Sequence, residues 1–453
     1  QLDSLGLAPK VERIVYSEKN ETVAGNITLD PAVRYYGHRA KDGRLEINGN
    51  IYTSSNITAT YGVAVQNRYT VLPVTEEVLL NSGYVVDMSN SSGSVGIQSL
   101  AGARAVNKGK VIVGNSSSAS AGIGILAESS TTNLTSVVND SGAVIEMPYA
   151  GIGIYLDSLE LGGSVTNAGT ISSTQANALG IYAKMSSAGV LGAPITAITN
   201  TGSINLSDNG FGIFTDNSTI TNSGNITVDN PGTNSIIAIY GGRNSIINNT
   251  GGNISVGEGG IAFYGNNTAM TISGGNFSTE GGTLIYAENN TNITYTANGT
   301  TLGNKIGIYL DQSKIDLGGK NFSVMDSGSA IYLLGANAEA KSLGTMTLGN
   351  NSEGAYVKNS MMNLLGGTMN ITGSNSTGII GINSNIENTT AINANISAGS
   401  FENKGLLVKV DDGGTYTIRN KAAINITGAN SLGIYGSTLD SSGNILGALN
   451  IIN

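Results

Sequence analysis

Hydrophobic residues alternate with small or polar residues over most of the chain, with a period of two. Around Tyr155 the apolar positions are Ile152, Ile154 and Leu156, and Gly153 falls on the same side as the tyrosine. The same spacing recurs in three further segments: 179–183, 211–215 and 306–310. Successive side chains of a strand point to opposite faces, so this pattern predicts short strands with one buried face.

A Gly-Ile-Tyr string recurs along the chain, with close variants. Its third residue falls at positions 98, 126, 155, 182, 214, 240, 264, 286, 309, 332, 356, 380, 407 and 435. The spacing runs from 22 to 32 residues and averages about 26. Units this short cannot bury a core alone, so the repeat indicates an architecture in which each unit packs on its neighbours.

A second string precedes most copies: Asn, one or two small residues, Gly, and then an apolar–polar alternation. Examples are 167–169 and 200–202. Asn and Gly tolerate positive φ, so we expect a turn followed by a strand. Two or three short strands per unit match one coil of a parallel β-helix, whose coils lie about 4.8 Å apart. We therefore predict an all-β parallel β-helix (β-solenoid) of about fourteen coils of ~22–32 residues.

The charge distribution suggests two regions. Charged residues concentrate in the first fifty positions, and a solenoid needs a polar first coil to prevent end-to-end pairing. We expect residues 1–60 to form an N-terminal cap and the first coils. Residues 61–453 then form the β-helix, with longer or irregular coils near 63–97 and 183–213.

The alternation also assigns side chains to the two faces. The predicted inward stack contains Ile154, Ile181, Ile213, Ile239, Phe263, Ile285, Ile308, Ile331 and Ile434. The predicted outer ladder contains Tyr155, Tyr182, Tyr240, Tyr264, Tyr286, Tyr309, Tyr332 and Tyr435. Two roles are open for these rings. They can cover glycine and stack between coils, or they can form an aromatic strip that docks sugars or protein. The first is favoured, because the ladder runs through coil after coil without a specialised position.

Composition narrows the function classes. The formal net charge is −9, which argues against a nucleic-acid partner. The chain has no Cys and a single His, His38, so disulfides, thiol nucleophiles, Cys-ligated metals and multi-His sites are excluded. Acidic residues are scattered, and Asp411-Asp412 is expected in a turn. We predict no catalytic residues, no metal and no cofactor.

One candidate ligand site lies near the N-terminus. A cationic aromatic cluster there can recognise an anionic or sugar ligand, although the same residues suit the cap. The candidate residues are Arg34, Tyr35, Tyr36, His38, Arg39, Arg68 and Tyr69.

The Asn-x-Gly-x-Ile string alternating with Gly-Ile-Tyr resembles the passenger region of Gram-negative type V autotransporters. It is most similar to the very large fusobacterial autotransporter adhesins, over about residues 90–453. The resemblance implies a right-handed parallel β-helix outside the cell, anchored in the outer membrane by a C-terminal β-barrel. The chain lacks that barrel's terminal signature, and it begins with Gln1. We therefore expect a passenger segment of a longer protein.

The expected function is that of a surface-displayed adhesin on the bacterial cell. Its partner would be a host-cell or bacterial surface receptor, either protein or glycan, and the passenger itself is expected to be monomeric. Two alternatives stay open. The segment can be a structural stalk for a binding head elsewhere, or a β-helix enzyme that degrades polysaccharide.

Overall fold

The structure is a computed structural model of the whole chain. It describes residues 14–15, 20–29, 36–41, 43–53, 61–66, 76–117, 119–130, 133–158, 162–175, 177–185, 196–207, 209–229, 236–279, 281–363, 366–400 and 402–453. The fold is an all-β parallel β-solenoid of about 13 turns, close to the fourteen coils predicted. The described residues contain no helix. Contacts divide the chain into two units, Gln1–Ile246 and Ile247–Asn453.

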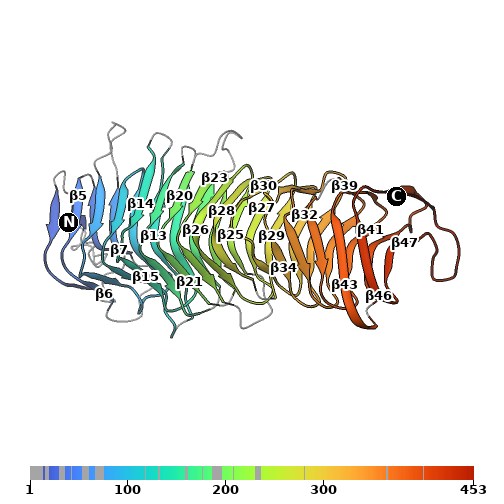
Figure 1. Cartoon of the computed structure of the whole chain (residues 1–453). Coiled ribbons are helices and arrows are strands. Elements are labelled where there is room, and N and C mark those ends of the chain that lie inside the picture. Colours follow the sequence, from blue (N-terminus) through green and yellow to red (C-terminus); the bar gives the residue numbers. More distant parts are fainter. Residues whose placement is uncertain are drawn as a thin grey trace. The chain divides into compact units, whose positions relative to one another are not determined.

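Each coil of unit 1 contributes three strands, and each strand pairs in parallel with its equivalent in the next coil (Figure 1). The first column contains β1 (Ile14–Val15), β4 (Tyr36–Lys41), β7 (Tyr61–Gln66), β10 (Val95–Leu100), β13 (Gly122–Glu128), β16 (Gly151–Ser158), β19 (Ala178–Met185), β22 (Phe211–Asp216) and β25 (Ile237–Gly242). The second contains β2 (Glu21–Val23), β5 (Arg44–Ile47), β8 (Glu77–Leu80), β11 (Arg104–Asn107), β14 (Thr135–Asn139), β17 (Gly163–Asn167), β20 (Thr196–Asn200) and β23 (Ser218–Asn222). The third contains β3 (Ile27–Leu29), β6 (Ile51–Thr53), β9 (Val85–Asp87), β12 (Lys110–Ile112), β15 (Val144–Met147), β18 (Thr170–Ser173), β21 (Ser203–Leu206) and β24 (Asn225–Val228).

Unit 2 repeats this arrangement, and the division between the units falls at the start of β26 (Ile246–Val256). Its first column contains β27 (Ile261–Asn266), β29 (Thr283–Glu288), β32 (Ile306–Asp311), β35 (Ser329–Leu334), β38 (Glu353–Lys358), β41 (Thr377–Ile382), β44 (Lys404–Lys409) and β47 (Leu432–Ser437). The strands that follow them are β28 (Ala269–Ser278), β30 (Asn292–Tyr295), β33 (Lys314–Asp316), β36 (Glu339–Lys341), β39 (Met361–Asn363), β42 (Asn385–Asn388), β45 (Thr415–Asn420) and β48 (Ala448–Ile452). The last column contains β31 (Thr301–Leu302), β34 (Phe322–Val324), β37 (Thr345–Leu348), β40 (Thr368–Ile371), β43 (Ala391–Ser400) and β46 (Ile424–Ala429).

The predicted inward stack is present in register. Ile154 pairs with Ile181 across β16 and β19, and Ile308 pairs with Ile331 across β32 and β35; all four side chains are fully buried. Ile434 is the exception, because it is only half-buried. It lies on β47, which pairs with β44 on one side and is the outermost strand of its column. The core therefore consists of aliphatic stacks that each coil continues from the coil before it.

The strict period-two assignment of the first column is wrong at one point. Gly153 and Ile154 are both buried, whereas Ile152 is half-buried on the outer face. A Cβ at Gly153 would lie 2.5 Å from Ile171 Cγ2 and 2.6 Å from the Gly180 carbonyl oxygen. The coil is so narrow here that only glycine fits inside. The alternation therefore shifts by one residue, and the residues three before each ring face outward.

The Asn-x-Gly string has a different physical basis from the one predicted. Neither Asn167 nor Gly169 has a positive φ, although many other Asn and Gly residues do. Gly169 is required by close approach, since a Cβ there would lie 2.3 Å from the Ala143 carbonyl oxygen. The asparagine ends its strand with its side chain fully buried. The string thus marks the end of a strand and a tightly stacked turn.

These buried asparagines form a ladder through unit 1. The Asn139 side-chain amide donates to Asn167 Oδ1 at 2.7 Å, and Asn167 donates to Asn200 Oδ1 at 2.8 Å. Asn107 and Asn222 extend the same row at its two ends. A buried amide must find a partner for each polar group. The stacked coils provide one in the equivalent residue of the next coil, which specifies the register.

Candidate binding surfaces

The N-terminal candidate residues are largely outside the described part of the chain. Arg34, Tyr35, Arg68 and Tyr69 lie outside the described residues. For the other three the structure describes the backbone only. Tyr36, His38 and Arg39 lie on β4, which pairs with β7. This site stays a prediction.

The outer rings of unit 1 stack between coils. The centroids of Tyr155 and Tyr182 are 5.2 Å apart with an interplanar angle of 6°, and those of Phe214 and Tyr240 are 4.3 Å apart at 9°. Between these pairs, Tyr182 and Phe214 meet edge to face at 66°. Phe214 takes the place of a tyrosine here, so the row continues through a ring that has no hydroxyl group.

Unit 2 carries a longer run of near-parallel rings. Tyr264, Tyr286, Tyr309, Tyr332 and Tyr356 stack in order, with centroid separations of 4.5–5.3 Å. Tyr356 was absent from the predicted ladder, although it occupies the equivalent position of its copy. The inner rings therefore have both faces covered by neighbouring rings.

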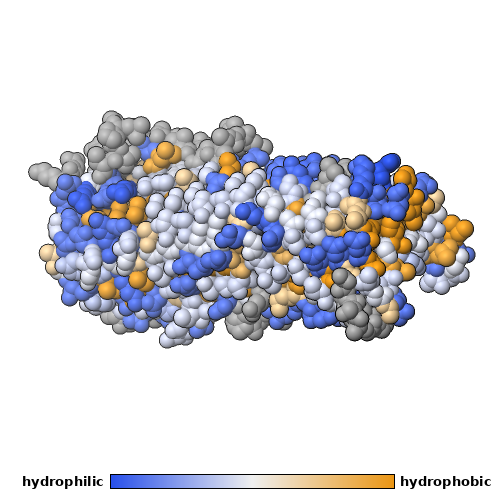
Figure 2. All heavy atoms as spheres, viewed as in Figure 1, coloured by the Kyte–Doolittle hydropathy of each residue, from blue (hydrophilic) through white to orange (hydrophobic). Residues whose placement is uncertain are grey.

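Tyr435 does not continue this ring stack. The equivalent positions before it are Ile380 and Leu407, and Tyr435 pairs with Leu407. Tyr435 is 42% exposed and Leu432 on the same strand is equally exposed. Figure 2 shows apolar surface gathered at this C-terminal part of unit 2. The ring stack therefore ends at Tyr356, one coil after Tyr332, because aliphatic side chains occupy the next two equivalent positions.

Ring stacking limits what the ladder can bind. A sugar docks on the face of an aromatic ring, but the faces of Tyr286, Tyr309 and Tyr332 are occupied by other rings. These three side chains are half-buried, so part of each one remains at the surface. Burial, with the nearby Asp157 carboxylate second, raises the pKa of Tyr155 to about 12. Burial also raises the pKa of Tyr309 to about 12. These phenols are therefore neutral hydrogen-bonding groups, and the geometry favours the stacking role.

The outward aliphatic row is the feature that the sequence interpretation missed. In unit 1 it runs beside the rings and, together with them, forms what we call the outer strip. The outer strip contains Ile123, Ile152, Leu179, Phe211 and Ile237, and beside them Leu126, Tyr155, Tyr182, Phe214 and Tyr240. Most of these side chains are half-buried. The signal that could have revealed them is the small buried residue that follows each aliphatic or phenylalanine position, because it shifts the alternation. This residue is Gly124, Gly153, Gly180, Gly212 or Ala238.

Acidic residues border the outer strip on the side away from the aliphatic row. Tyr155 donates a hydrogen bond to Asp157 Oδ2 at 3.3 Å, and Asp216 forms an ion pair with Arg243 at 2.7 Å. Burial, followed by the charge of Asp157, raises the pKa of the Glu128 carboxyl. The strip thus combines an apolar centre with a charged edge of mixed sign, in which Asp157 is in register with Lys184 and Asp216 is paired with Arg243.

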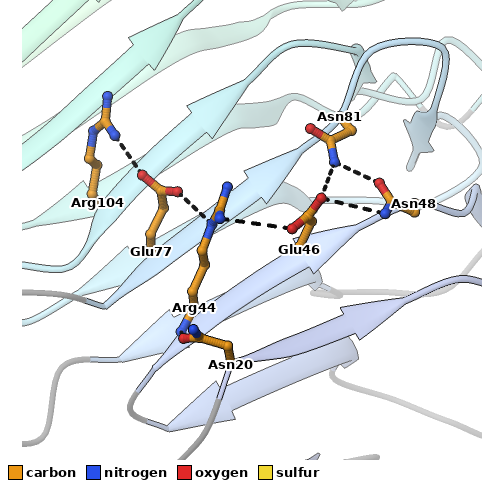
Figure 3. A network of polar contacts seen from close by, with 7 residues as sticks. All are labelled: Asn20, Arg44, Glu46, Asn48, Glu77, Asn81 and Arg104. Carbon is orange, nitrogen blue, oxygen red and sulfur yellow. Dashed lines mark hydrogen bonds and ion pairs between the residues drawn. The ribbon is translucent and has the colours of Figure 1, made fainter.

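A charged network covers the second-column strands at the start of unit 1 (Figure 3). Glu77 lies between Arg44 and Arg104 in register and binds both, at 3.1 Å and 2.6 Å. On β5, Glu46 accepts a hydrogen bond from Asn81 at 2.6 Å. Both guanidinium groups are about half exposed, so each ion pair contributes at most ~1 kcal/mol. The alternating signs favour correct stacking of these coils.

Part of the chain is similar to a known protein family. Residues 126–252 match the family model of the BigA third pectate lyase-like domain. This match extends from within β13 into β26 and includes most of the outer strip and the asparagine ladder. The chain is thus a β-solenoid protein with a BigA-like, pectate lyase-like domain. No curated protein matches the chain, and no solved structure does.

No group of three or more His, Cys, Asp or Glu side chains in the described residues lies close enough together to hold a metal ion. No helix in that part of the chain is both long and apolar enough to cross a membrane.

Proposed function

We propose that the chain is an autotransporter passenger displayed on the bacterial surface, where it acts as an adhesin. The observation that supports this function is the outer strip of unit 1. Half-exposed aliphatic and aromatic side chains recur there in register, coil after coil, beside a charged border. Contiguous apolar surface framed by polar residues is typical of interaction sites. The strip favours a host-cell or bacterial surface protein as its partner.

The test is binding of the purified chain to epithelial and bacterial cells. Leu179 lies on the strip, and replacing it by Glu places a charge in its apolar centre. We expect the Leu179→Glu variant to bind cells at least about tenfold more weakly, as expected for a residue in the centre of an interface. Ala197→Glu is the matched control, because Ala197 is exposed on the neighbouring column, on β20. Equal binding by both variants would show that the strip is not the site. A wild-type chain that bound no cell would favour the stalk alternative.

A polysaccharide-degrading enzyme is the second candidate, because residues 126–252 match a domain described as pectate lyase-like. A lyase or glycosidase needs acidic or basic groups that converge on the scissile bond. Incubation of the chain with polygalacturonate and with neutral polysaccharides, followed by chromatography of the products, tests this alternative. Release of oligosaccharides would support an enzyme and count against a purely adhesive role.

A further inference from the structure

Unit 2 has a groove that none of the sequence motifs indicated. It is a shallow, open groove of about 620 Å³, and this volume lies within the ~300–1,000 Å³ range of small-molecule sites. Its lining residues are Ala336, Asn359, Ser360, Met361, Asn383, Asn385, Asp412 and Tyr416. They come from four successive coils: from the corners that follow β35, β38, β41 and β44, and from the first residues of β39, β42 and β45.

The groove exists because one corner is longer than its neighbours. Two residues connect β38 to β39, and two connect β41 to β42, whereas residues 410–414 connect β44 to β45. The short corners turn through Asn359 and Asn383, both with positive φ. The longer corner contains Asp411 and Asp412, with a bend at Asp412 and Gly413. The additional residues therefore add a wall beside the amides of the earlier coils, of which Asn359 is exposed, Asn385 half-buried and Asn383 buried.

This wall is held in one conformation. Asp412 accepts a hydrogen bond from the Tyr416 hydroxyl at 2.5 Å and another from the Gly414 amide at 2.9 Å. The Tyr416 hydrogen bond is the main cause that lowers the pKa of Asp412, so this carboxylate is ionised at neutral pH. A Cβ at Gly414 would lie 2.7 Å from the Tyr416 ring, so glycine lets the ring lie against the loop. The aromatic surface is therefore fixed before any ligand arrives.

The amides are also oriented. Asn383 donates to Asp411 Oδ1 at 2.6 Å and accepts from the Asp411 backbone amide at 2.9 Å. Asn385 Oδ1 accepts the Thr417 backbone amide at 2.9 Å, which leaves the Asn385 NH2 group as a donor. Asn359 is exposed at the same edge. Donors, an acceptor carboxylate and a ring thus converge on one volume.

We propose that this groove binds a neutral sugar. A sugar hydroxyl both donates and accepts, so it can use the carboxylate and the amide donors together, while its C–H face packs on Tyr416 and Met361. A cationic ligand, such as a lysine or arginine side chain, fits the groove less well, because it has no hydrogen-bond acceptor for the Asn385 amide. An anionic ligand meets the Asp412 charge, and no Lys or Arg is among the described lining residues. The inference extends the proposed adhesive function to a second surface, separate from the outer strip.

Saturation-transfer NMR on the full chain tests the inference, with mannose, galactose, N-acetylglucosamine and glucuronate as probes. We expect at least one neutral sugar to bind and glucuronate to bind about tenfold more weakly or not at all. Tyr416→Ala and Asn385→Ala should each weaken binding about tenfold, since each removes one oriented contact. Gly414→Ala, which displaces the ring, should weaken it as well. Asn425→Ala is the matched control, because Asn425 is an exposed amide on β46 that bonds to Asn393.

Three outcomes would overturn the inference: no neutral sugar binds, glucuronate binds in preference, or Tyr416→Ala binds like the wild type. Unchanged thermal unfolding of each variant shows that any loss is local. Cell binding of Leu179→Glu is measured separately. Adhesion that persists without sugar binding removes this inference alone, whereas sugar binding by a chain that adheres to no cell removes the proposed function alone.

Discussion

Ile152 and Ile154 lie two residues apart on the same strand but face opposite sides of the coil. Ile154 is fully buried in the aliphatic stack, whereas Ile152 is half-buried on the outer strip. Gly153 between them faces inward as well, which shifts the alternation by one residue. This local shift creates both the core and the surface on which the proposed adhesive function rests.

Substituting each of the two isoleucines by alanine tests this register. Ile154→Ala removes fully buried methyl groups and leaves a cavity, so it should lower the free energy of unfolding by about 2–5 kcal/mol. Ile152→Ala is the matched control on the same strand and should cost less than about 1.5 kcal/mol, because its side chain is already partly hydrated. Chemical denaturation monitored by circular dichroism measures both. Equal losses would contradict the assignment.

The buried glycine makes a second prediction. Gly153→Ala should lower the free energy of unfolding by about 1–3 kcal/mol, because its Cβ would overlap Ile171 and the Gly180 carbonyl. Gly433 is the equivalent glycine on β47, where the nearest atom to an added Cβ is 3.9 Å away. Thermal unfolding of Gly433→Ala should therefore match the wild type. A destabilised Gly433→Ala beside an unaffected Gly153→Ala would rule out the steric explanation.

The sequence predicts the fold class well, because the evidence for it is a repeat and not a single segment. Fourteen copies of one string at a coil-like spacing average out the local errors, and the inward Ile181 and Ile308 follow directly. The outward Ile152 could not be predicted in this way, because a strict period-two pattern does not show where two consecutive residues both face the interior of the coil. The groove beside Tyr416 was also out of reach, since it depends on the difference in length between neighbouring corners and on hydrogen bonds between coils.

Removal of one asparagine from the buried ladder should destabilise unit 1. Asn167→Ala leaves the Asn139 amide without its acceptor and Asn200 Oδ1 without its donor, both in the interior. Each unsatisfied group costs about 1–3 kcal/mol. We expect reduced stability in denaturant titrations and faster amide exchange of residues 139 and 200. Asn276→Ala, which removes an outer-face amide that bonds to Asn253, is the control and should change little. Unaltered exchange in Asn167→Ala would mean that the ladder contributes no stability.

Two substitutions separate what the stacked ring contributes to the free energy of unfolding from what its hydroxyl group contributes. Tyr309 lies between Tyr286 and Tyr332, with centroid separations of 4.5 Å and 5.3 Å. Tyr309→Ser removes both stacking contacts and should cost about 1–3 kcal/mol, at ~0.5–1.5 kcal/mol per aromatic pair. Tyr309→Phe keeps them and should stay close to the wild type. Both variants should adhere to cells normally if the ladder is structural. Lost adhesion at unchanged stability would instead assign the ladder to ligand binding.

Stability should fall steeply at alkaline pH because of the same ladder. Burial raises the pKa of Tyr155 and of Tyr309 from about 10 to about 12. An unfolded phenol ionises near pH 10, whereas these two keep their protons in the folded chain up to about pH 12. The unfolded chain therefore binds fewer protons in this interval, and the free energy of unfolding decreases as the pH rises. Below pH 10 both states hold the protons, so this contribution to stability is present in full. Denaturation midpoints measured between pH 9 and pH 12 should show the decrease, and Tyr309→Phe should make it shallower by removing one of the phenols with a raised pKa. A flat profile over that range, with phenolate absorbance appearing near pH 10 in the folded protein, would show that the stacked phenols are not protected.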